Sequence, residues 1–480
     1  MAAAGLCTIV SAGVLLSWIA LRKEGWHGPN LALLSLGLGP GIGLGIASFQ
    51  LFFWRWAGFR MPGPISFLAL GTGVALLVMR AKKVVDSGNE QESPEGSLII
   101  SIVAHLVLIL SIASVLNAYL AISRAWPGGI WDAVGIYNVR ARLFYERYDD
   151  FPDVLKQVSA ASHPNYPLLL PGAIAALDSF LGHYSDSAPR VVGLAFVVAT
   201  GLLTYSVLRY QVGSAIAAAV AATVWSAPIF WVVGLGQMAD VPAAYYLFGG
   251  TAVLSSQFAD ASRPRLPAYI GGFFIACLMW TKNEGVITGG LVLILFGAMQ
   301  LRRWLSSPAV AMRITSQVLI GIAPGILALV LLKRDWAPSS GLDVFFSHNW
   351  MTRIAASTRW WIPIRELWFR LVAHTDGWWK IEWSFVWSVV LGGLIAAAIT
   401  RYRGSRPSTR FWVVIVILSM VCWIPIYAVT PYDQMWHITT SMDRLFLQIF
   451  PVALVAITLT LAEDRALSSL TMQAGATLPD

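Results

Sequence analysis

Long apolar runs recur along the whole chain and constrain its fold more than any other feature. A helix of about 20 apolar residues crosses a hydrocarbon core of about 30 Å. By this measure the sequence predicts about thirteen membrane helices. The pair beside Thr281–Glu284 is either two full crossings or two shallow helices broken at that polar point. The predicted spans are 5–21, 31–53, 63–79, 98–120, 191–208, 214–233, 241–258, 268–281, 284–301, 314–332, 384–400, 411–429 and 445–462.

Charged side chains are too scarce to cover the surface of a soluble protein of this length. Lys, Arg, Asp and Glu make up 12% of the 480 residues, against roughly 25% in an ordinary soluble domain. Apolar residues reach 57%, and the mean hydropathy is +0.67. This composition argues against a soluble enzyme, a disordered chain and a disulfide scaffold. It favours an all-α, polytopic membrane protein.

The net charge of +8 comes from Lys and Arg scattered between the apolar runs. No basic stripe or nucleic-acid-binding motif accompanies it, so no nucleic-acid partner is expected. Positive residues that flank membrane spans explain the excess better, because cytoplasmic loops are enriched in them. We therefore expect the protein to be surrounded by membrane lipids. We expect it to be a multi-pass protein of the plasma (inner) membrane.

The segment 166–180 decides the topology, because it is apolar yet rich in proline and carries Asp178. If it lies at the interface, the basic loop clusters all fall on one side of the membrane; if it spans, they scatter over both. The positive-inside rule favours the interfacial interpretation and makes that side cytoplasmic. The clusters are Arg22/Lys23, Arg80/Lys82/Lys83, Arg263/Arg265, Arg302/Arg303/Arg313 and Arg401/Arg403/Arg406/Arg410.

Three loops then face outward, at 123–190, 333–383 and 430–444, and the first two are too long to be simple connectors. We divide the chain into membrane helices and a polar linker (Asp86–Gly96) at 1–97, a catalytic membrane region at 98–462 and a cytoplasmic tail at 463–480. Tryptophans are dense in the second loop, where they form either an interfacial belt, the preferred interpretation, or stacking faces for sugars. They are Trp336, Trp350, Trp360, Trp361, Trp368, Trp378, Trp379 and Trp383.

Asp132 stands just beyond the end of a predicted span and before an amphipathic stretch at Ala133–Tyr148. A carboxylate there is well placed to take a proton from an acceptor hydroxyl. The alternative is that Asp132 only caps the following helix, since Asp is favoured at that position. Downstream, closely spaced prolines fix an extended path that brings His163 and Asn165 to the membrane surface, either as pocket residues or as interfacial anchors.

Other polar residues interrupt apolar sequence at the same outer face. Asp240 precedes Pro242, which suits a helix start as well as a pocket. Lys282 and Glu284 either pair with each other or leave Lys282 to bind a phosphate. Arg444 opposes the helix dipole at the start of the last span, so we expect it to hold a phosphate or a carboxylate, with Asp443 as its nearest structural partner.

Taken together, these motifs resemble the C-type multi-pass membrane glycosyltransferases, which include protein O-mannosyltransferases and lipid A aminoarabinose transferases. The resemblance covers roughly residues 98–462 and extends to a bacterial branch that is mostly uncharacterised. The Gly-rich span Gly37–Trp54 is also similar to that branch. The motifs are Trp131-Asp132, His163-Pro164-Asn165-Tyr166-Pro167-Leu168, Trp280-Thr281-Lys282-Asn283-Glu284-Gly285 and Trp436-His437 with Ser441-Met442-Asp443-Arg444-Leu445.

The resemblance implies transfer of a sugar from a polyprenyl-phosphate donor to a glycan, lipid or protein acceptor, at a site facing the periplasm or exterior. It makes Asp132 the catalytic residue, either as a base or as a holder of a divalent cation. Ala133 stands where many relatives carry a second acidic residue, which argues against a two-carboxylate metal site. The competing hypothesis is a transporter or flippase of a lipid-linked sugar, with no chemistry of its own.

The expected site combines the implied roles with the residue patterns. The donor-phosphate-binding residues are Lys282, Arg444 and Arg140, and the pocket residues are His163, Asn165, Tyr166, Asp240, His437 and Asp443. No resident cofactor is expected apart from that divalent cation, and its ligands are not assigned. Replacing Asp132 with Asn is expected to abolish transfer without affecting membrane insertion.

Overall fold

The computed structural model describes residues 2–64, 66, 72, 97–259, 265–338, 350–372, 386–401 and 406–475, and every regular element among them is a helix. The predicted span 63–79 lies almost wholly outside these residues. The linker Asp86–Gly96, Arg80, Lys82, Lys83, Arg263, Arg403, Trp378, Trp379 and Trp383 lie wholly outside them. The all-α prediction is confirmed.

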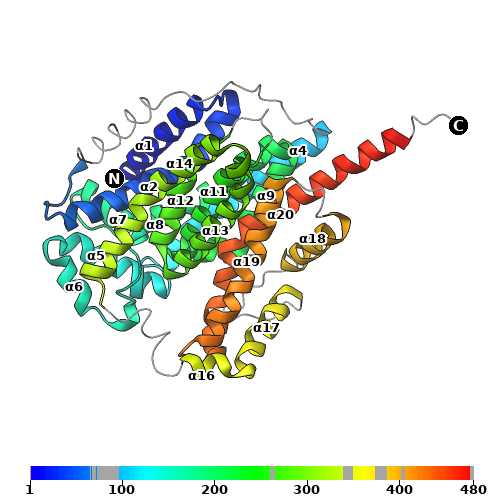
Figure 1. Cartoon of the computed structure of the whole chain (residues 1–480). Helices are drawn as coiled ribbons and strands as arrows, with labels where there is room; N and C mark the ends of the chain where they lie inside the picture. The colour runs from blue at the N-terminus through cyan, green and yellow to red at the C-terminus, as the bar shows by residue number, and fades with distance from the viewer. Residues whose placement is uncertain are drawn as a thin grey trace.

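The helices form one elongated bundle, shown in Figure 1. Its first part comprises α1 (Ala2–Lys23), α2 (Gly28–Trp56), α4 (Leu98–Ala125), α5 (Val139–Glu146), α6 (Phe151–Gln157), α7 (Leu169–Leu181), α8 (Ser187–Val212), α9 (Ser214–Ser226) and α10 (Pro228–Leu235). Its second part comprises α11 (Asp240–Ser256), α12 (Ala268–Thr281), α13 (Asn283–Ser306), α14 (Pro308–Leu331), α16 (Trp350–Ala355), α17 (Ser357–Val372), α18 (Val386–Arg401), α19 (Pro407–Val429) and α20 (Gln434–Gly475). Short π-helical turns at Ala133–Asn138 and Leu332–Trp336 and 3₁₀ turns at Tyr148–Asp150 and Ala160–Ser162 complete the set.

Eight of the described helices are long and apolar enough to cross a membrane, or nine if α9 and α10 form one span bent by 60°. The count of thirteen is not confirmed. Helices α11, α12 and α18 do occupy predicted spans, but they have only 17, 14 and 16 residues. Helix α7 has 13 residues and is enclosed by other helices over most of its length, as α12 is.

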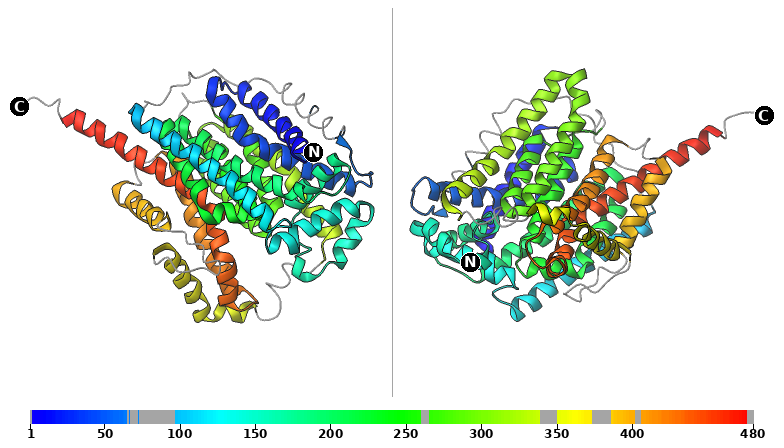
Figure 2. Two further views of the ribbon diagram at one scale, coloured as in Figure 1. Left: turned by 180° about the vertical axis from the view of Figure 1, so that it is seen from behind. Right: turned by 60° about the horizontal axis from the view of Figure 1, so that its bottom comes forward.

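Helix α4 shows why this bundle requires lipid. Its apolar side chains face outward, with Leu98 74% and Leu110 65% exposed. In water such a surface would be strongly unfavourable, whereas lipid tails solvate it. Figure 2 shows α4 on the outside of the bundle and the end of α20 extending away from it. The chain is a multi-pass membrane protein by these criteria.

Small residues allow the central helices to approach closely, which is how membrane helices pack without a hydrophobic driving force. A Cβ on Gly272 of α12 would lie 2.3 Å from a backbone oxygen of α14, and one on Gly13 of α1 would lie 2.0 Å from a backbone oxygen of α2. Helices α1, α2, α8, α11 and α12 therefore share one core.

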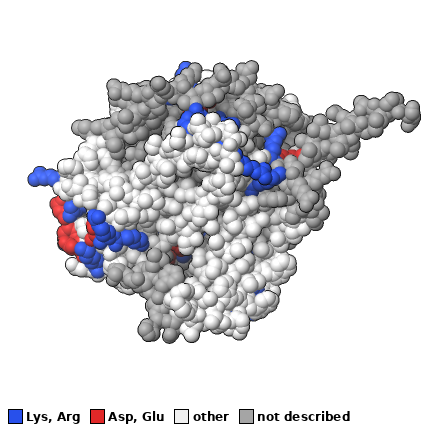
Figure 3. All heavy atoms as spheres, in the orientation of Figure 1, with Lys and Arg blue, Asp and Glu red and all other residues white. Residues whose placement is uncertain are grey.

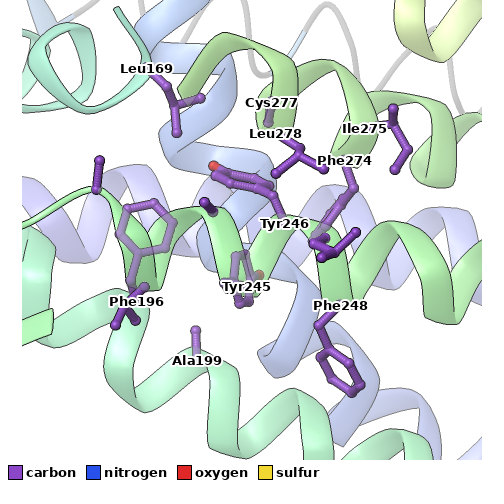
Figure 4. Packing of buried hydrophobic residues seen from close by; sticks show 14 of the residues in the cluster. Leu169, Phe196, Ala199, Tyr245, Tyr246, Phe248, Phe274, Ile275, Cys277 and Leu278 are labelled. Carbon is purple, nitrogen blue, oxygen red and sulfur yellow. The ribbon is translucent and has the colours of Figure 1, made fainter. Parts of the chain in front are cut away.

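Helix α2 contains Pro40, which has no N–H to donate to the turn before it. The Tyr245 hydroxyl from α11 bridges this turn, donating to the Gly37 carbonyl at 2.7 Å and accepting from the Gly41 N–H at 3.1 Å. Tyr246 adds a bond to the Gly41 carbonyl at 2.9 Å. Figure 4 shows both tyrosines with Phe196 and Phe274 at the centre of the bundle.

At one end of the bundle the structure brings together described residues of three predicted basic clusters, those at 22–23, 265 and 302–313. The Trp26 indole donates to the Arg265 carbonyl, and Arg303 donates to the Gln257 carbonyl. Glu24 lies near Arg313, which partly offsets the rise that burial causes in the pKa of that carboxyl. Figure 3 shows mostly Lys and Arg at the top and upper right, both signs together at the left over α5 and α6, and an almost uncharged band between them.

Candidate functional site

Asp240 is the first residue of α11 and is fully buried at the end of the bundle away from the basic loops. Its Oδ1 accepts from Lys282 Nζ at 2.9 Å and from Gln448 Nε2 at 2.9 Å. Its Oδ2 accepts from Arg444 Nε at 3.0 Å and also lies 2.9 Å from Arg444 Nη2. Asp240 therefore joins the start of α11, the break between α12 and α13, and the middle of α20.

Two more carboxylates extend this centre in opposite directions. Arg444 Nη2 lies 2.6 Å from Asp132 Oδ2, and Lys282 Nζ lies 3.5 Å from Glu284 Oε1. We call Asp132, Arg444, Asp240, Lys282 and Glu284 the ion network. Its charges alternate in sign along this path, and with three carboxylates and two cations its net charge is −1. Asp240 and Lys282 are buried and Arg444 is 12% exposed, whereas Asp132 and Glu284 are each 30% exposed.

The break between α12 and α13 delivers Lys282 to the network. Lys282 has extended backbone angles, φ −150° and ψ 160°, so it terminates α12 and lets α13 begin at Asn283. Both sequence hypotheses for Lys282 and Glu284 were incomplete, because Lys282 contacts Glu284 but also the more deeply buried Asp240.

Asp132 stands before the π-helical turn, at the expected helix start, but its side chain makes no capping hydrogen bond. It pairs with Arg444 instead. The amphipathic helix expected at Ala133–Tyr148 is present as the π-helical turn followed by α5, with Ile136 and Phe144 buried as predicted. Capping therefore does not account for this carboxylate.

Backbone strain is concentrated around the network. Among the described residues, three non-glycine residues have positive φ: Trp131 at 32°, His163 at 45° and Gln237 at 68°. Trp131 precedes Asp132, and Gln237 lies three residues before Asp240. Non-glycine residues in this region cost about 1–3 kcal/mol each and persist only where the surroundings impose them. The fold thus holds the segments beside both carboxylates in unfavourable conformations.

Hydrogen bonds impose these conformations by tying the first outward loop to the turn before α11. Asn138 Nδ2 donates to Gln237 Oε1 at 2.6 Å and to the Gly128 carbonyl at 2.8 Å. The Ile130 N–H donates to the Gly236 carbonyl at 3.1 Å. Gly129, with φ of 89°, allows this approach, since a Cβ there would lie 2.6 Å from Ala133. Asp132 and Asp240 are consequently held on connected backbone.

Arg140 is buried and donates to three carbonyls, those of His163, Tyr166 and Pro167, at 3.1, 2.6 and 3.1 Å. Its guanidinium therefore holds the His163–Pro167 segment in place. Burial lowers the pKa of Arg140 to about 10, which leaves it charged at neutral pH. This geometry does not favour the predicted donor-phosphate role of Arg140, since its hydrogen-bonding groups are directed at the backbone.

Lys333 was not anticipated as a site residue. It lies in the π-helical turn after α14, where its Nζ donates to the Asn165 carbonyl and, at 3.1 Å, to Asn283 Oδ1. Both acceptors are neutral, and no carboxylate of the described residues pairs with it. An ammonium group has three donors, so one is left for a ligand. Its only sequence signal was a Lys directly after an apolar run.

His163 and Tyr137 lie beside the network. Burial lowers the pKa of the His163 imidazole, with smaller opposing effects from Glu284 and Asp132, so the ring is neutral at neutral pH. Its ring stacks on Tyr166 with centroids 4.6 Å apart. Burial, Asp240 and Asp132 together raise the pKa of Tyr137 well above its usual range. The Tyr137 hydroxyl is buried without a hydrogen-bond partner among the described residues.

The remaining predicted pocket residues are distributed over different surroundings. Asn165 is buried and contributes its carbonyl to Lys333. His437 Nδ1 lies 2.9 Å from Thr430 Oγ1 and shares a cavity with Glu284. Asp443 faces away from the network and pairs with Arg370 at 2.9 Å. The expected pairing of Asp443 with Arg444 is thus absent from these contacts.

A divalent cation does not fit this arrangement well. Asp240 uses both of its oxygens on Lys282, Gln448 and Arg444, and Asp132 is paired with Arg444. No group of three or more His, Cys, Asp or Glu side chains suited to hold a metal ion occurs within the described residues. We therefore derive no step through a metal.

Comparisons with protein-family models, with curated proteins and with solved structures gave no match to this chain, so the function is argued from the site alone.

Proposed function

We propose that this protein is an integral-membrane glycosyltransferase, which moves a sugar from a polyprenyl-phosphate donor to an acceptor hydroxyl on the outer face of the membrane. The observation that supports this best is Asp132. It is a partly exposed carboxylate fixed by Arg444 at the end of a buried ion network, on backbone held in an unfavourable conformation. Such fixed orientation is what a general base needs.

In this proposal Asp132 accepts the proton of the acceptor hydroxyl as its oxygen attacks the anomeric carbon of the sugar. The bond from that carbon to the phosphate oxygen breaks, and its electron pair leaves with the polyprenyl phosphate. Arg444 holds the Asp132 carboxylate in place through their ion pair, and Asp240 holds Arg444 in position. A base of this kind contributes about 10² to 10⁴ in rate.

The geometry changes the roles proposed for the cations. Lys282 is buried, Arg444 is largely enclosed, and both are already paired with carboxylates, so they act in this proposal by positioning Asp132 and Asp240. Lys333 carries a positive charge with one donor left and lies against Asn165 and Asn283. We assign the leaving phosphate to Lys333, with the Tyr137 hydroxyl as a further donor to the sugar or the phosphate.

The proposed orientation rests on charge. The described residues of the basic loops lie at one end of the bundle and the ion network lies at the other, and the positive-inside rule supports our proposal that the network faces away from the cytoplasm. This agrees with a donor presented on the periplasmic or exterior side of the plasma membrane.

The test is transfer from a radiolabelled polyprenyl-phosphate sugar in proteoliposomes, comparing Asp132→Asn with Asp153→Asn. Asp153 lies in the same outward loop with its side chain 75% exposed, so it controls for a lost charge. We expect Asp132→Asn to lose about 10² to 10⁴ in rate and Asp153→Asn to retain full activity. Full activity in Asp132→Asn would refute the mechanism. Movement of the intact lipid-linked sugar across the bilayer, with its glycosidic bond unbroken, would identify a flippase instead.

A further inference from the structure

A small cavity lies beside the Glu284 end of the ion network, between α13, α19 and α20. Its volume is about 40 Å³. Its polar wall includes Glu284, Thr288, His437 and Ser441, and its apolar wall includes Ile287 and Leu291. Ile287 is also 46% exposed, so the cavity reaches the outer surface of the bundle beside this side chain.

Two buried oxygen atoms in this cavity lack partners. Glu284 Oε1 faces Lys282, but Glu284 Oε2 and Ser419 Oγ are buried with no hydrogen bond among the described residues. Leaving such groups unsatisfied costs about 1–3 kcal/mol each, and more for a charged group. A group that donates hydrogen bonds inside the cavity would remove that cost.

The negative charge around the cavity indicates which chemical group can occupy it. The ion network carries a net charge of −1. Glu284, the carboxylate at one end of the network, lines the cavity. An anionic phosphate would be repelled there, whereas a hydroxyl or an amine would be attracted. The free donor of Lys333 serves phosphate better, so the donor lipid and the occupant of this cavity are separate molecules.

The place where the cavity opens, beside Ile287, indicates what the remainder of the ligand must be. Ile287 begins an apolar exposed face of α13, which continues to Ile294 at 71% exposed, within a helix long enough to cross the membrane. A molecule that enters past Ile287 therefore comes from the lipid phase. With only about 40 Å³ available, the cavity admits a headgroup donor, while an acyl chain stays along α13.

We propose that this cavity binds the acceptor, and that the acceptor is a membrane lipid whose hydroxyl or amine headgroup donates to Glu284 Oε2. This inference rests on the proposed glycosyltransferase function and narrows its acceptor from glycan, lipid or protein to an amphiphile. Glu284 anchors one headgroup donor, and a second hydroxyl of the same headgroup meets Asp132. Glu284 and Asp132 are the two partly exposed ends of one ion network, which links the cavity to the proposed base.

The experiment uses photo-crosslinking in nanodiscs, which needs no transfer activity. The probe is a C16 primary alcohol with a diazirine in its chain, and the matched control probe is its methyl ether, which cannot donate a hydrogen bond. We expect the alcohol to label peptides of α13 and α19, and the ether to label them about tenfold less, as expected for a hydrogen bond to a charged acceptor.

Variants separate the cavity from the general lipid surface. Ile287→Trp fills the mouth and Glu284→Leu removes the acceptor, so both are expected to abolish the preference for the alcohol. Ile294→Trp adds the same bulk to the exposed face farther along α13. This variant is expected to keep the preference for the alcohol probe. Equal labelling by alcohol and ether, or competition by polyprenyl phosphate, would overturn the proposal. If the labelling is as expected but the protein transfers no sugar, the lipid-binding site is supported and the proposed glycosyltransferase function is refuted.

Discussion

Asp443 and Arg444 are neighbours on α20 but belong to two different charge groups. Successive helical residues point about 100° apart, so Arg444 faces Asp240 and Asp132 while Asp443 faces Arg370 of α17. Arg370 is also paired with Glu366, and we call Asp443, Arg370 and Glu366 the triad. Glu366 pairs in turn with Arg365, so the charges of this second group balance, whereas the ion network carries a net charge of −1.

The two groups differ in access and in backbone strain. All three triad members are at most 12% exposed, and the triad links only α17 to α20. The ion network links several segments and ends in two carboxylates that are 30% exposed, and strained residues adjoin it. Strain retained beside accessible carboxylates is a mark of function, because a purely structural pair has no need of it.

The largest difference between the groups is expected when each loses one carboxylate. Asp240→Ala leaves the buried Lys282 and the largely enclosed Arg444 without their common partner, which should destabilise the protein by about 3–5 kcal/mol. Asp443→Ala leaves Arg370 with Glu366, so about 1–2 kcal/mol is expected. Unfolding in detergent micelles, followed by thermal or denaturant titration, measures both. Equal losses would show that the ion network is no more interdependent than the triad.

Lys333→Gln tests whether the unpaired cation serves a ligand rather than the fold. The amide still donates to the Asn165 carbonyl, but the charge is lost, so the KM for the polyprenyl-phosphate donor should rise by roughly tenfold to a hundredfold. Stability should change little. Arg370→Gln is the matched control from the triad, with the opposite pattern: lower stability and an unchanged KM. A rise in KM for both variants would contradict the distinction.

Asp178 provides a carboxylate that belongs to neither group. It is buried on α7 with one oxygen accepting from the Ser185 N–H and the other unpartnered among the described residues. Burial raises the pKa of Asp178 to about 7. Since the folded pKa exceeds the unfolded one, its protonated form stabilises the protein at low pH. That contribution is lost as the pH rises from about 4 to about 7.

Wild-type protein should therefore lose about 2 kcal/mol between pH 5 and pH 7 relative to Asp178→Asn, which has no proton to lose at this position. Stability of both proteins as a function of pH measures the difference. If the two curves of stability against pH are parallel, the pKa of Asp178 is not raised in the folded protein. Burial without a nearby cation would then have no effect that sets Asp178 apart from the paired carboxylates.

The smallest effect concerns the strained residue beside Asp132. Trp131→Gly relieves a φ of 32°, which should offset the added flexibility of the unfolded chain and leave stability within about 1 kcal/mol of wild type. Trp126→Gly is the control, because Trp126 has an ordinary φ of −133° and similar exposure. It should be the less stable variant. Transfer activity should fall only in Trp131→Gly, since Asp132 is then less firmly held.

The fold class and the positions of most helices were predictable because apolar length and local charge are properties of single segments. The basic loops at one end were predictable for the same reason. The number of crossings was not, since short helices such as α12 are enclosed by other helices and need not match the membrane thickness. Burial by neighbours is not visible in a hydropathy pattern.

The sequence allowed us to predict which residues form the site better than which ion pairs they make. Asp132, Asp240, Lys282 and Arg444 were selected, and they meet. The partner of each was missed, because Asp240 and Arg444 are separated by 204 residues and only tertiary packing brings them together. Lys333 and the contacts of Arg140 were missed for a different reason, since their acceptors are mainly backbone carbonyls, which every residue type carries.

The bond from Tyr245 to the turn at Pro40 has a consequence for biosynthesis. Helix α2 is made and inserted while the hydroxyl that bridges it is still 204 residues from synthesis. During that interval its polar backbone groups must be satisfied by water, by the insertion machinery or by a transient helix partner, because lipid tails offer none. Docking of α11 would then complete α2 late, which makes these two helices the expected control point of assembly in the membrane.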